Sequence, residues 1–157
     1  MTTRNRTLKL EDVSFELPAS WTGQVLASGP IEDGFRPNLV AVVGACIDGE
    51  TATEFAQRML PELKRTTVEY RLVREGPAIF GQVSGFLREH TFLHEGVRVG
   101  QMQLYVVKNG QARTFTFTHL ATKMNAARPQ AEALFASLRL AAPAEELLKS
   151  AGRQVRA

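Results

Sequence analysis

The feature that most constrains the fold is the dipeptide Asn109-Gly110, which lies between two long alternating runs. Asparagine and glycine tolerate the positive φ angles of a type I′ turn, so this dipeptide predicts a tight β-hairpin. Residues 97–108 form the predicted strand before the turn, and residues 113–120 form the strand after it. A third alternating run, residues 82–93, precedes a glycine-containing turn at 94–96. Three strands joined by tight turns predict an antiparallel meander.

Shorter patterns predict further strands and three helices around this meander. Thr51 and Glu54 fit the capping box of a first helix, which Pro61 is expected to kink or end early. A second helix is expected just after Pro129, and a shorter third helix from Pro143. The additional strands are expected at residues 13–17, 24–27, 39–45 and 68–73.

The order of strands, helix, meander and helix predicts an α+β fold, in which helices flank an antiparallel β-sheet. Gly76-Pro77 is expected to break the strand pattern, because proline donates no backbone hydrogen bond. Trp21 lies in a short connection and is expected to cover the sheet edge or the rim of the core. We expect one domain over residues 1–157, with a core at about 8–142 and a short C-terminal helix and tail at 143–157.

The composition suits a globular protein of this size. The 157 residues are 44% hydrophobic, enough for a core without disulfides, and Cys46 is the single cysteine. The net charge of +3 arises from 19 basic and 16 acidic residues scattered along the chain, which argues against nucleic-acid binding. The first seven residues lack an apolar stretch of signal-peptide length, so we expect no leader there, and no run of about 20 apolar residues occurs in the sequence. We therefore expect a soluble, cytoplasmic protein that does not insert into membranes.

Candidate catalytic and metal-binding residues are few. Ser84 lies in a segment that only partly resembles a nucleophile elbow, since no helix is expected to follow it. His90 and His94 on one strand would lie about 13 Å apart, too far to share a metal ion, so we expect exposed histidines at the sheet edge. His119 is expected to be structural. We therefore expect no catalytic residue, metal site or cofactor, and a hydrolase that uses Ser84 or the histidines is the third of three hypotheses.

The two faces of the strand at 97–108 differ in chemistry. Met102, Leu104 and Val106 alternate on one face, which has the composition of a helix-covered core. The opposite face is apolar at one end, rich in amides in the middle and aromatic at the other end, and it carries Val97, Val99, Gln101, Gln103 and Tyr105. Sequence pattern alone favours a solvated face with two cross-strand amides. The alternative is a shallow groove for an apolar partner, whose polar atoms the amides would satisfy.

Several short motifs occur in an order and spacing that resemble a known superfamily over about residues 8–142. They are Phe15-Glu16-Leu17-Pro18 with Trp21, Asn38-Leu39-Val40, Phe55-Ala56, Gly81, Gln103-Leu104-Tyr105-Val106-Val107, Thr116-Phe117-Thr118 and Phe135-Ala136-Ser137-Leu138. On these motifs the chain resembles the DcrB/PsbP-like superfamily, and within it the effector-associated (Eag-type) chaperones of bacterial type VI secretion.

This resemblance implies a PsbP-like α/β/α sandwich and a homodimer without a cofactor. It also implies that the sheet faces hold the hydrophobic N-terminal transmembrane helices of a secreted effector before export. By position, Gln103 matches a groove glutamine that contacts the client helix, and Val99 and Val40 match apolar groove positions. Leu26 is a looser match, and the helix glutamine of the family falls near Gln57.

The leading hypothesis is therefore a cytoplasmic adaptor chaperone for hydrophobic helices of a secreted effector. Its predicted client-binding groove contains Leu26, Val40, Gln57, Val97, Val99, Gln101, Gln103 and Tyr105. The second hypothesis is a non-enzymatic accessory module of PsbP/DcrB type that binds a folded protein partner. That module would have no affinity for isolated apolar helices.

Overall fold

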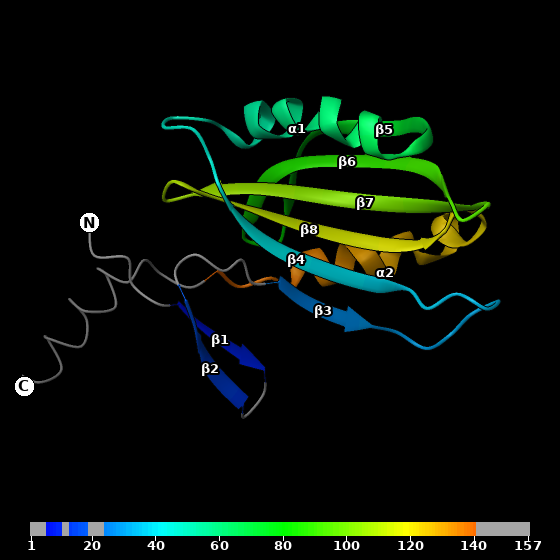
Figure 1. The fold of residues 1–157 in the computed structure, drawn as a ribbon, viewed down its shortest axis with the longest axis horizontal. Coiled ribbons are helices and arrows are strands. Elements are labelled where there is room, and N and C mark those ends of the chain that lie inside the picture. The colour runs from blue at the N-terminus through cyan, green and yellow to red at the C-terminus, as the bar shows by residue number, and fades with distance from the viewer. Residues whose placement is uncertain (1–5, 11–12, 19–23, 141–157) are drawn as a thin grey trace, which may run out of the picture.

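The computed structural model describes residues 6–10, 13–18 and 24–140. Six antiparallel strands form one sheet in the order β3-β4-β8-β7-β6-β5 (Figure 1). Their bounds are β3 Gln24–Ser28, β4 Asn38–Ala45, β5 Val68–Phe80, β6 Val83–His94, β7 Val97–Lys108 and β8 Gln111–Leu120. A separate two-stranded sheet pairs β1 (Arg6–Leu10) with β2 (Val13–Leu17). Trp21 and the helix expected from Pro143 lie outside the described residues.

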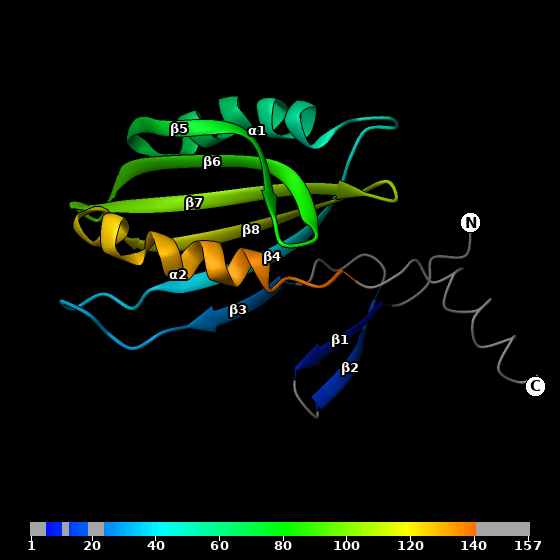
Figure 2. The same cartoon turned by 180° about the vertical axis from the view of Figure 1, so that it is seen from behind.

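The two helices lie on opposite faces of the six-stranded sheet. Helix α1 (Ala52–Thr66) lies on the face seen in Figure 1, and α2 (Met124–Ala136) crosses the other face in Figure 2. A short 3-10 turn, η1 (Ala121–Lys123), leads from β8 into α2. The predicted α+β fold, an antiparallel sheet flanked by helices, is confirmed.

Both predicted tight turns of the meander are present. Asn109 and Gly110 have φ angles of 53° and 72°, and Glu95 and Gly96 have φ angles of 49° and 79°. Positive φ at both central residues is the requirement of a type I′ turn, and its twist matches the twist of the flanking strands.

The predicted early end of the first helix at Pro61 and the predicted strand break at Gly76-Pro77 are wrong, and the second helix begins earlier than expected. Thr51 caps helix α1, and its hydroxyl accepts a hydrogen bond from the Glu54 amide as predicted, but the helix continues through Pro61, which is exposed. Strand β5 continues through Gly76-Pro77, because it is an edge strand and an edge tolerates a residue without a backbone donor. Helix α2 begins ahead of Pro129, so this proline lies inside the helix.

Each helix covers a separate hydrophobic cluster. The cluster under α2 includes Met102, Leu104 and Val106, as predicted for that face of β7, together with Phe115, Phe117, Met124, Ala131 and Phe135. The smaller cluster under α1 consists of Phe55, Ala56, Phe86, Tyr105 and Ala112. The sheet therefore has a core on both faces.

A buried carboxylate joins α2 to the sheet. Glu89 on β6 is 2% exposed; its carboxylate accepts hydrogen bonds from Arg74 Nε at 2.7 Å and from Arg128 Nη2 at 2.6 Å. Burial alone would raise the pKa of Glu89, but the hydrogen bonds from Arg128 and Arg74 outweigh it and hold the pKa below its ordinary value. The negative charge of Glu89 is therefore balanced by Arg74 from β5 and by Arg128 from α2.

Candidate binding groove

The sheet face that carries α1 is only partly covered by it. Helix α1 contacts β5, β6 and β7, and the part of this face over β8, β4 and β3 is open in Figure 1. A groove of about 500 Å³ lies on this face and spans β6, β7, β8 and β4. Its lining comes from four strands and the β3–β4 connection, and consists of Phe35, Asn38, Val40, Phe92, His94, Val99, Gln101, Gln103, Thr116 and Thr118.

Strand register explains why these side chains meet, because directly paired residues of antiparallel strands lie on the same face. One row across the sheet follows the pairs Gln103–Thr116, Thr116–Val40 and Val40–Leu26. The adjacent row follows the pairs Gln101–Thr118 and Thr118–Asn38. Residues that are far apart in sequence are thereby assembled into one polar and apolar surface.

Four of the predicted groove residues, Val40, Val99, Gln101 and Gln103, line this groove together. Val99 is 3% exposed and lies at its floor, while the other three are half-buried. Side chains of this kind offer a partner both apolar contact and hydrogen bonds.

The other four predicted residues lie outside the lining. Leu26 is 59% exposed on the same face near the edge of the sheet, and Val97 is 48% exposed at the start of β7. Gln57 is exposed on α1. The expectation that Tyr105 lies on an open surface is corrected: it is 2% exposed because α1 covers it, with its ring 6.1 Å from that of Phe55.

The glutamine amides take part in two chains of hydrogen bonds that cross the sheet. In the first chain, Arg88 Nη1 lies 3.3 Å from the Tyr105 hydroxyl, which donates to Gln103 Oε1, and Gln103 Nε2 donates to Thr116 Oγ1 at 3.3 Å. In the second chain, His90 Nε2 lies 3.0 Å from Gln101 Oε1, and Gln101 Nε2 donates to Thr118 Oγ1 at 3.1 Å.

Two members of these hydrogen-bond chains lie inside the protein. Arg88 and His90 are fully buried, so the prediction of an exposed His90 at the sheet edge is wrong, whereas His94 is exposed. The reason is that α1 and Tyr70 cover this part of β6, with the Tyr70 ring 4.9 Å from that of His90. Burial lowers the pKa of His90, which favours the neutral imidazole.

The threonines of the groove were missed by the sequence analysis, although a signal for them exists. A two-residue turn at Asn109-Gly110 pairs Lys108 with Gln111, and this register places Thr116 opposite Gln103 and Thr118 opposite Gln101. Phe35, in contrast, lies in the irregular β3–β4 connection, which has no periodic pattern.

The loop that carries Phe35 is fastened to the end of the sheet. Glu32 Oε2 lies 2.6 Å from His119 Nε2, Asp33 forms an ion pair with Lys123 at 2.8 Å, and the Phe35 ring stacks on His119 at 5.8 Å. These contacts give His119 a structural role, as expected, and fix one wall of the groove.

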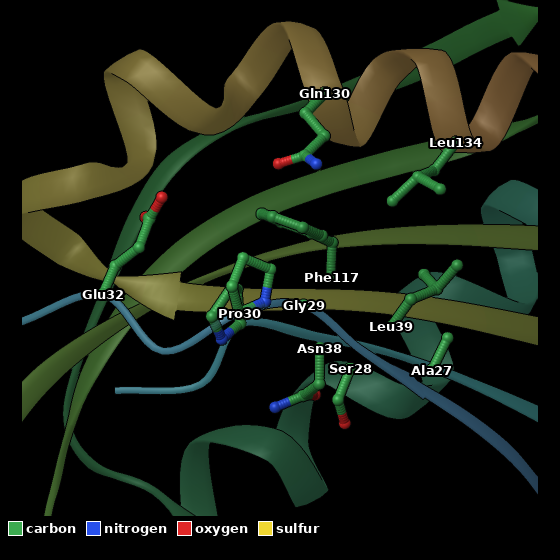
Figure 3. A pocket seen from close by; sticks show the side chains of 11 residues that line it. Ala27, Ser28, Gly29, Pro30, Glu32, Asn38, Leu39, Phe117, Gln130 and Leu134 are labelled. Atoms are coloured by element: carbon green, nitrogen blue, oxygen red, sulfur yellow. The ribbon is translucent and has the colours of Figure 1, made fainter. Parts of the chain in front are cut away.

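A second hollow lies on the opposite face, between α2 and the β3–β4 connection. Figure 3 shows Gln130 and Leu134 of α2 above Phe117 and Leu39 of the sheet, with Pro30 closing the far side. Its volume is about 250 Å³, half that of the groove.

Over residues 24–140 and the described parts of the N-terminal segment, no group of three metal-binding side chains occurs. None of the helices in the described chain is both long enough and apolar enough to span a bilayer.

Comparisons with known proteins place the fold. No protein-family model matches the chain, and no curated protein sequence matches it. The chain is similar in structure to a protein of unknown function, PA94 of Pseudomonas aeruginosa, with a TM-score of 0.73 and 13% identity over 88% of this chain and 98% of that one. It is also similar to LpqN of Mycobacterium tuberculosis, with a TM-score of 0.50 and 14% identity over 83% of this chain and 75% of that one. A third similar structure is PsbP (CyanoP) of Synechocystis, with a TM-score of 0.49 and 10% identity over 87% and 92% of the two chains. At such identities the similarity shows the fold alone.

Proposed function

We propose that this protein is a cytoplasmic adaptor chaperone that shields an apolar helix of a client in the groove on the α1 face. In its specific form, the client is the hydrophobic N-terminal transmembrane segment of a type VI secretion effector. The support for this specific form is the motif resemblance described above. The support for helix binding comes from the groove itself.

The observation that carries the proposal is the width of sheet that α1 leaves open. Six strands about 4.8 Å apart make a sheet about 24 Å wide, whereas a helix with its side chains is about 10–12 Å across. Helix α1 makes its main contacts with β5, β6 and β7. The uncovered strip is therefore about as wide as one more helix, and it runs beside α1 (Figure 1).

The chemistry of the groove suits an apolar guest that has a few polar atoms. Val40, Val99, Phe35 and Phe92 supply apolar contact, and each CH₂ group they remove from water stabilises the complex by about 0.8 kcal/mol. The amides and hydroxyls along the centre of the groove can pair with polar atoms that burial would otherwise leave unsatisfied. The proposed activity needs no catalytic residue, cofactor or nucleic acid.

A homodimer, which the resemblance implies, is part of the proposal, and the edges of the sheet favour one surface for it. Edge strand β5 carries Arg71, Arg74, Pro77 and two register irregularities, devices that discourage pairing with another chain. Edge strand β3 has the sequence Gln-Val-Leu-Ala-Ser, without charge or proline, and its five residues are exposed. Pairing of two β3 strands would extend the sheet and place the two grooves in one surface.

The second candidate is an accessory module that binds a folded protein. The similarity to LpqN, which is described as involved in cell envelope biogenesis, favours this class. The two candidates differ in one measurable property, since the accessory module has no affinity for an isolated apolar helix.

Co-expression with an apolar N-terminal segment of a candidate effector tests the proposal. Val40→Asp places a carboxylate in the groove and is expected to weaken capture of the segment by about tenfold or more. Val43→Asp is the matched control, because Val43 lies on the same strand, is equally half-buried and points to the opposite face.

Selective loss of capture in Val40→Asp, with both variants folded by circular dichroism, supports the groove. Equal capture by both variants contradicts the site. Binding of a folded partner together with no binding of any apolar helix supports the accessory module instead.

A further inference from the structure

The two groove glutamines are oriented in the same way. In each, the carbonyl oxygen faces a buried side chain, His90 of β6 for Gln101 and Tyr105 of β7 for Gln103, while the amide nitrogen is turned toward a threonine of β8. Gln103 and Gln101 are two residues apart on β7 and both line the groove. The two amide groups therefore point in the same direction, with their nitrogens on the β8 side.

Tyr105 and Arg88 hold Gln103 in this orientation. A guanidinium has only donors, so the Tyr105 hydroxyl accepts from Arg88, and it donates its single hydrogen to Gln103 Oε1. With the carbonyl oxygen held by this bond, the amide nitrogen of Gln103 faces Thr116.

Arg88 itself has little freedom to move. It is fully buried; its Nε donates to Glu75 Oε2 at 2.9 Å and its Nη1 donates to the Ala56 carbonyl of α1 at 2.9 Å. The guanidinium also lies 5.5 Å from the centre of the Tyr105 ring. The orientation of Gln103 is therefore built into the contact between α1 and the sheet.

The groove is left with hydrogen-bond donors. An amide nitrogen carries two hydrogens, and each glutamine uses only one of them on its threonine. Each threonine oxygen accepts that bond, and neither hydroxyl donates a hydrogen bond within the described part of the chain, so the hydroxyl hydrogens are also available. A docked guest therefore meets N–H and O–H groups along the centre line of the groove.

We propose that Arg88 and Tyr105 act as positioning residues that make the groove a donor surface, which selects apolar helices bearing a hydrogen-bond acceptor on the docked side. Such acceptors are the oxygens of serine and threonine, or the carbonyls left unpaired at a helix C-terminus. This inference rests on the proposed function, because it specifies which helices the groove prefers.

A pair of synthetic helices tests the inference with the unmodified full-length protein. Both are leucine- and alanine-rich peptides with lysines at one end for solubility, and they differ at one central guest residue. The guest is O-methylserine, which can only accept a hydrogen bond, or norvaline, which has the same shape with a methylene in place of the oxygen. We expect fluorescence anisotropy to show about fivefold tighter binding of the O-methylserine peptide, the effect of one net hydrogen bond. Hydrophobicity alone predicts the opposite order.

The positioning role has its own variant and control. Tyr105→Phe removes the hydroxyl that holds Gln103 Oε1 and keeps the ring against Phe55, so the fivefold preference should fall toward one. Tyr70→Phe is the control, because the buried Tyr70 hydroxyl has no hydrogen-bond partner, and this variant should keep the preference. The side-chain ¹⁵N–¹H resonances of Gln103 should shift in Tyr105→Phe only.

The outcomes separate the inference from the proposed function. Equal affinity of the native protein for both peptides overturns the donor surface while helix binding stands. An unchanged preference in Tyr105→Phe overturns the positioning role of Tyr105 and Arg88. Failure of the native protein to bind either peptide overturns both. Tighter binding of the norvaline peptide shows that apolar contact alone decides the choice of guest, and also overturns the inference.

Discussion

Replacing Glu89 with glutamine tests how α2 is held on the sheet. Helix α2 covers the face opposite to α1, so its attachment bears on why the open groove lies on the α1 face. One carboxylate oxygen accepts from Arg128 and the other accepts from Arg74. Glutamine keeps one acceptor, but its NH₂ group must face an arginine N–H, so one charge-assisted bond is lost and two donors are brought together.

The expected cost follows from the burial of the group. Breaking a buried ion pair by removing one partner costs about 3–5 kcal/mol. Arg74 and Arg128 have side chains that are 44% and 27% exposed, so water can reach them after the substitution. We therefore expect the lower end of that range, a loss of about 3 kcal/mol in the free energy of unfolding.

Urea denaturation at pH 7 measures this loss, and Glu132→Gln is the matched control. Glu132 accepts from the same Arg74 at 3.4 Å but is 41% exposed, so its substitution should cost less than about 1 kcal/mol. The pKa of Glu89 is lower in the folded protein than its ordinary value of 4.5, so its contribution is present above that pH and is lost as the pH falls through the folded pKa. The difference in the free energy of unfolding between the native protein and Glu89→Gln should therefore become smaller as the pH falls. Equal costs for the two variants at pH 7 would refute the reasoning.

Two further predictions concern the hairpin and the buried histidine. Gly110→Ala should lower the free energy of unfolding by about 1 kcal/mol, because alanine is strained at a φ of 72°. Gly44→Ala is the control and should not destabilise the protein, since the space around a Cβ at that position is open. Thermal denaturation distinguishes the two variants. Burial lowers the pKa of His90, so this imidazole takes up a proton near pH 6.5 in the unfolded chain but stays neutral at that pH in the folded protein. Stability should therefore fall by up to about 1.4 kcal/mol between pH 7.5 and 5.5, and a His90→Phe variant should lose that part of the slope.

The sequence was sufficient for those parts of the groove that depend on local pattern. Alternation along β7 separates Gln101 and Gln103 from Met102, and the turn at Asn109-Gly110 fixes which threonine faces each glutamine. Both are short-range properties, because a strand has a period of two and a two-residue turn permits one register.

The parts that could not be predicted depend on contacts between residues distant in sequence. Arg88 and His90 lie in an alternating strand with charged neighbours, a pattern that is equally compatible with exposure. Their burial depends on α1, and the partners of Arg88 come from Glu75 and the carbonyl of Ala56. The same helix covers Tyr105 and leaves Gln103 accessible, a distinction that one strand's pattern cannot contain.

The mixed composition of the groove follows from the need to remain stable both empty and occupied. The α2 face is lined by fully buried residues such as Met102 and Leu104, and such a surface would promote aggregation if it were uncovered. A face lined only by polar groups would gain little from covering a guest. Between Val99 at the floor and Val40 at the wall, glutamines and threonines satisfy one another across the sheet, so the empty groove keeps its polar atoms bonded. A guest that adds acceptors to the remaining hydrogens then gains both apolar contact and hydrogen bonds without disrupting those already made.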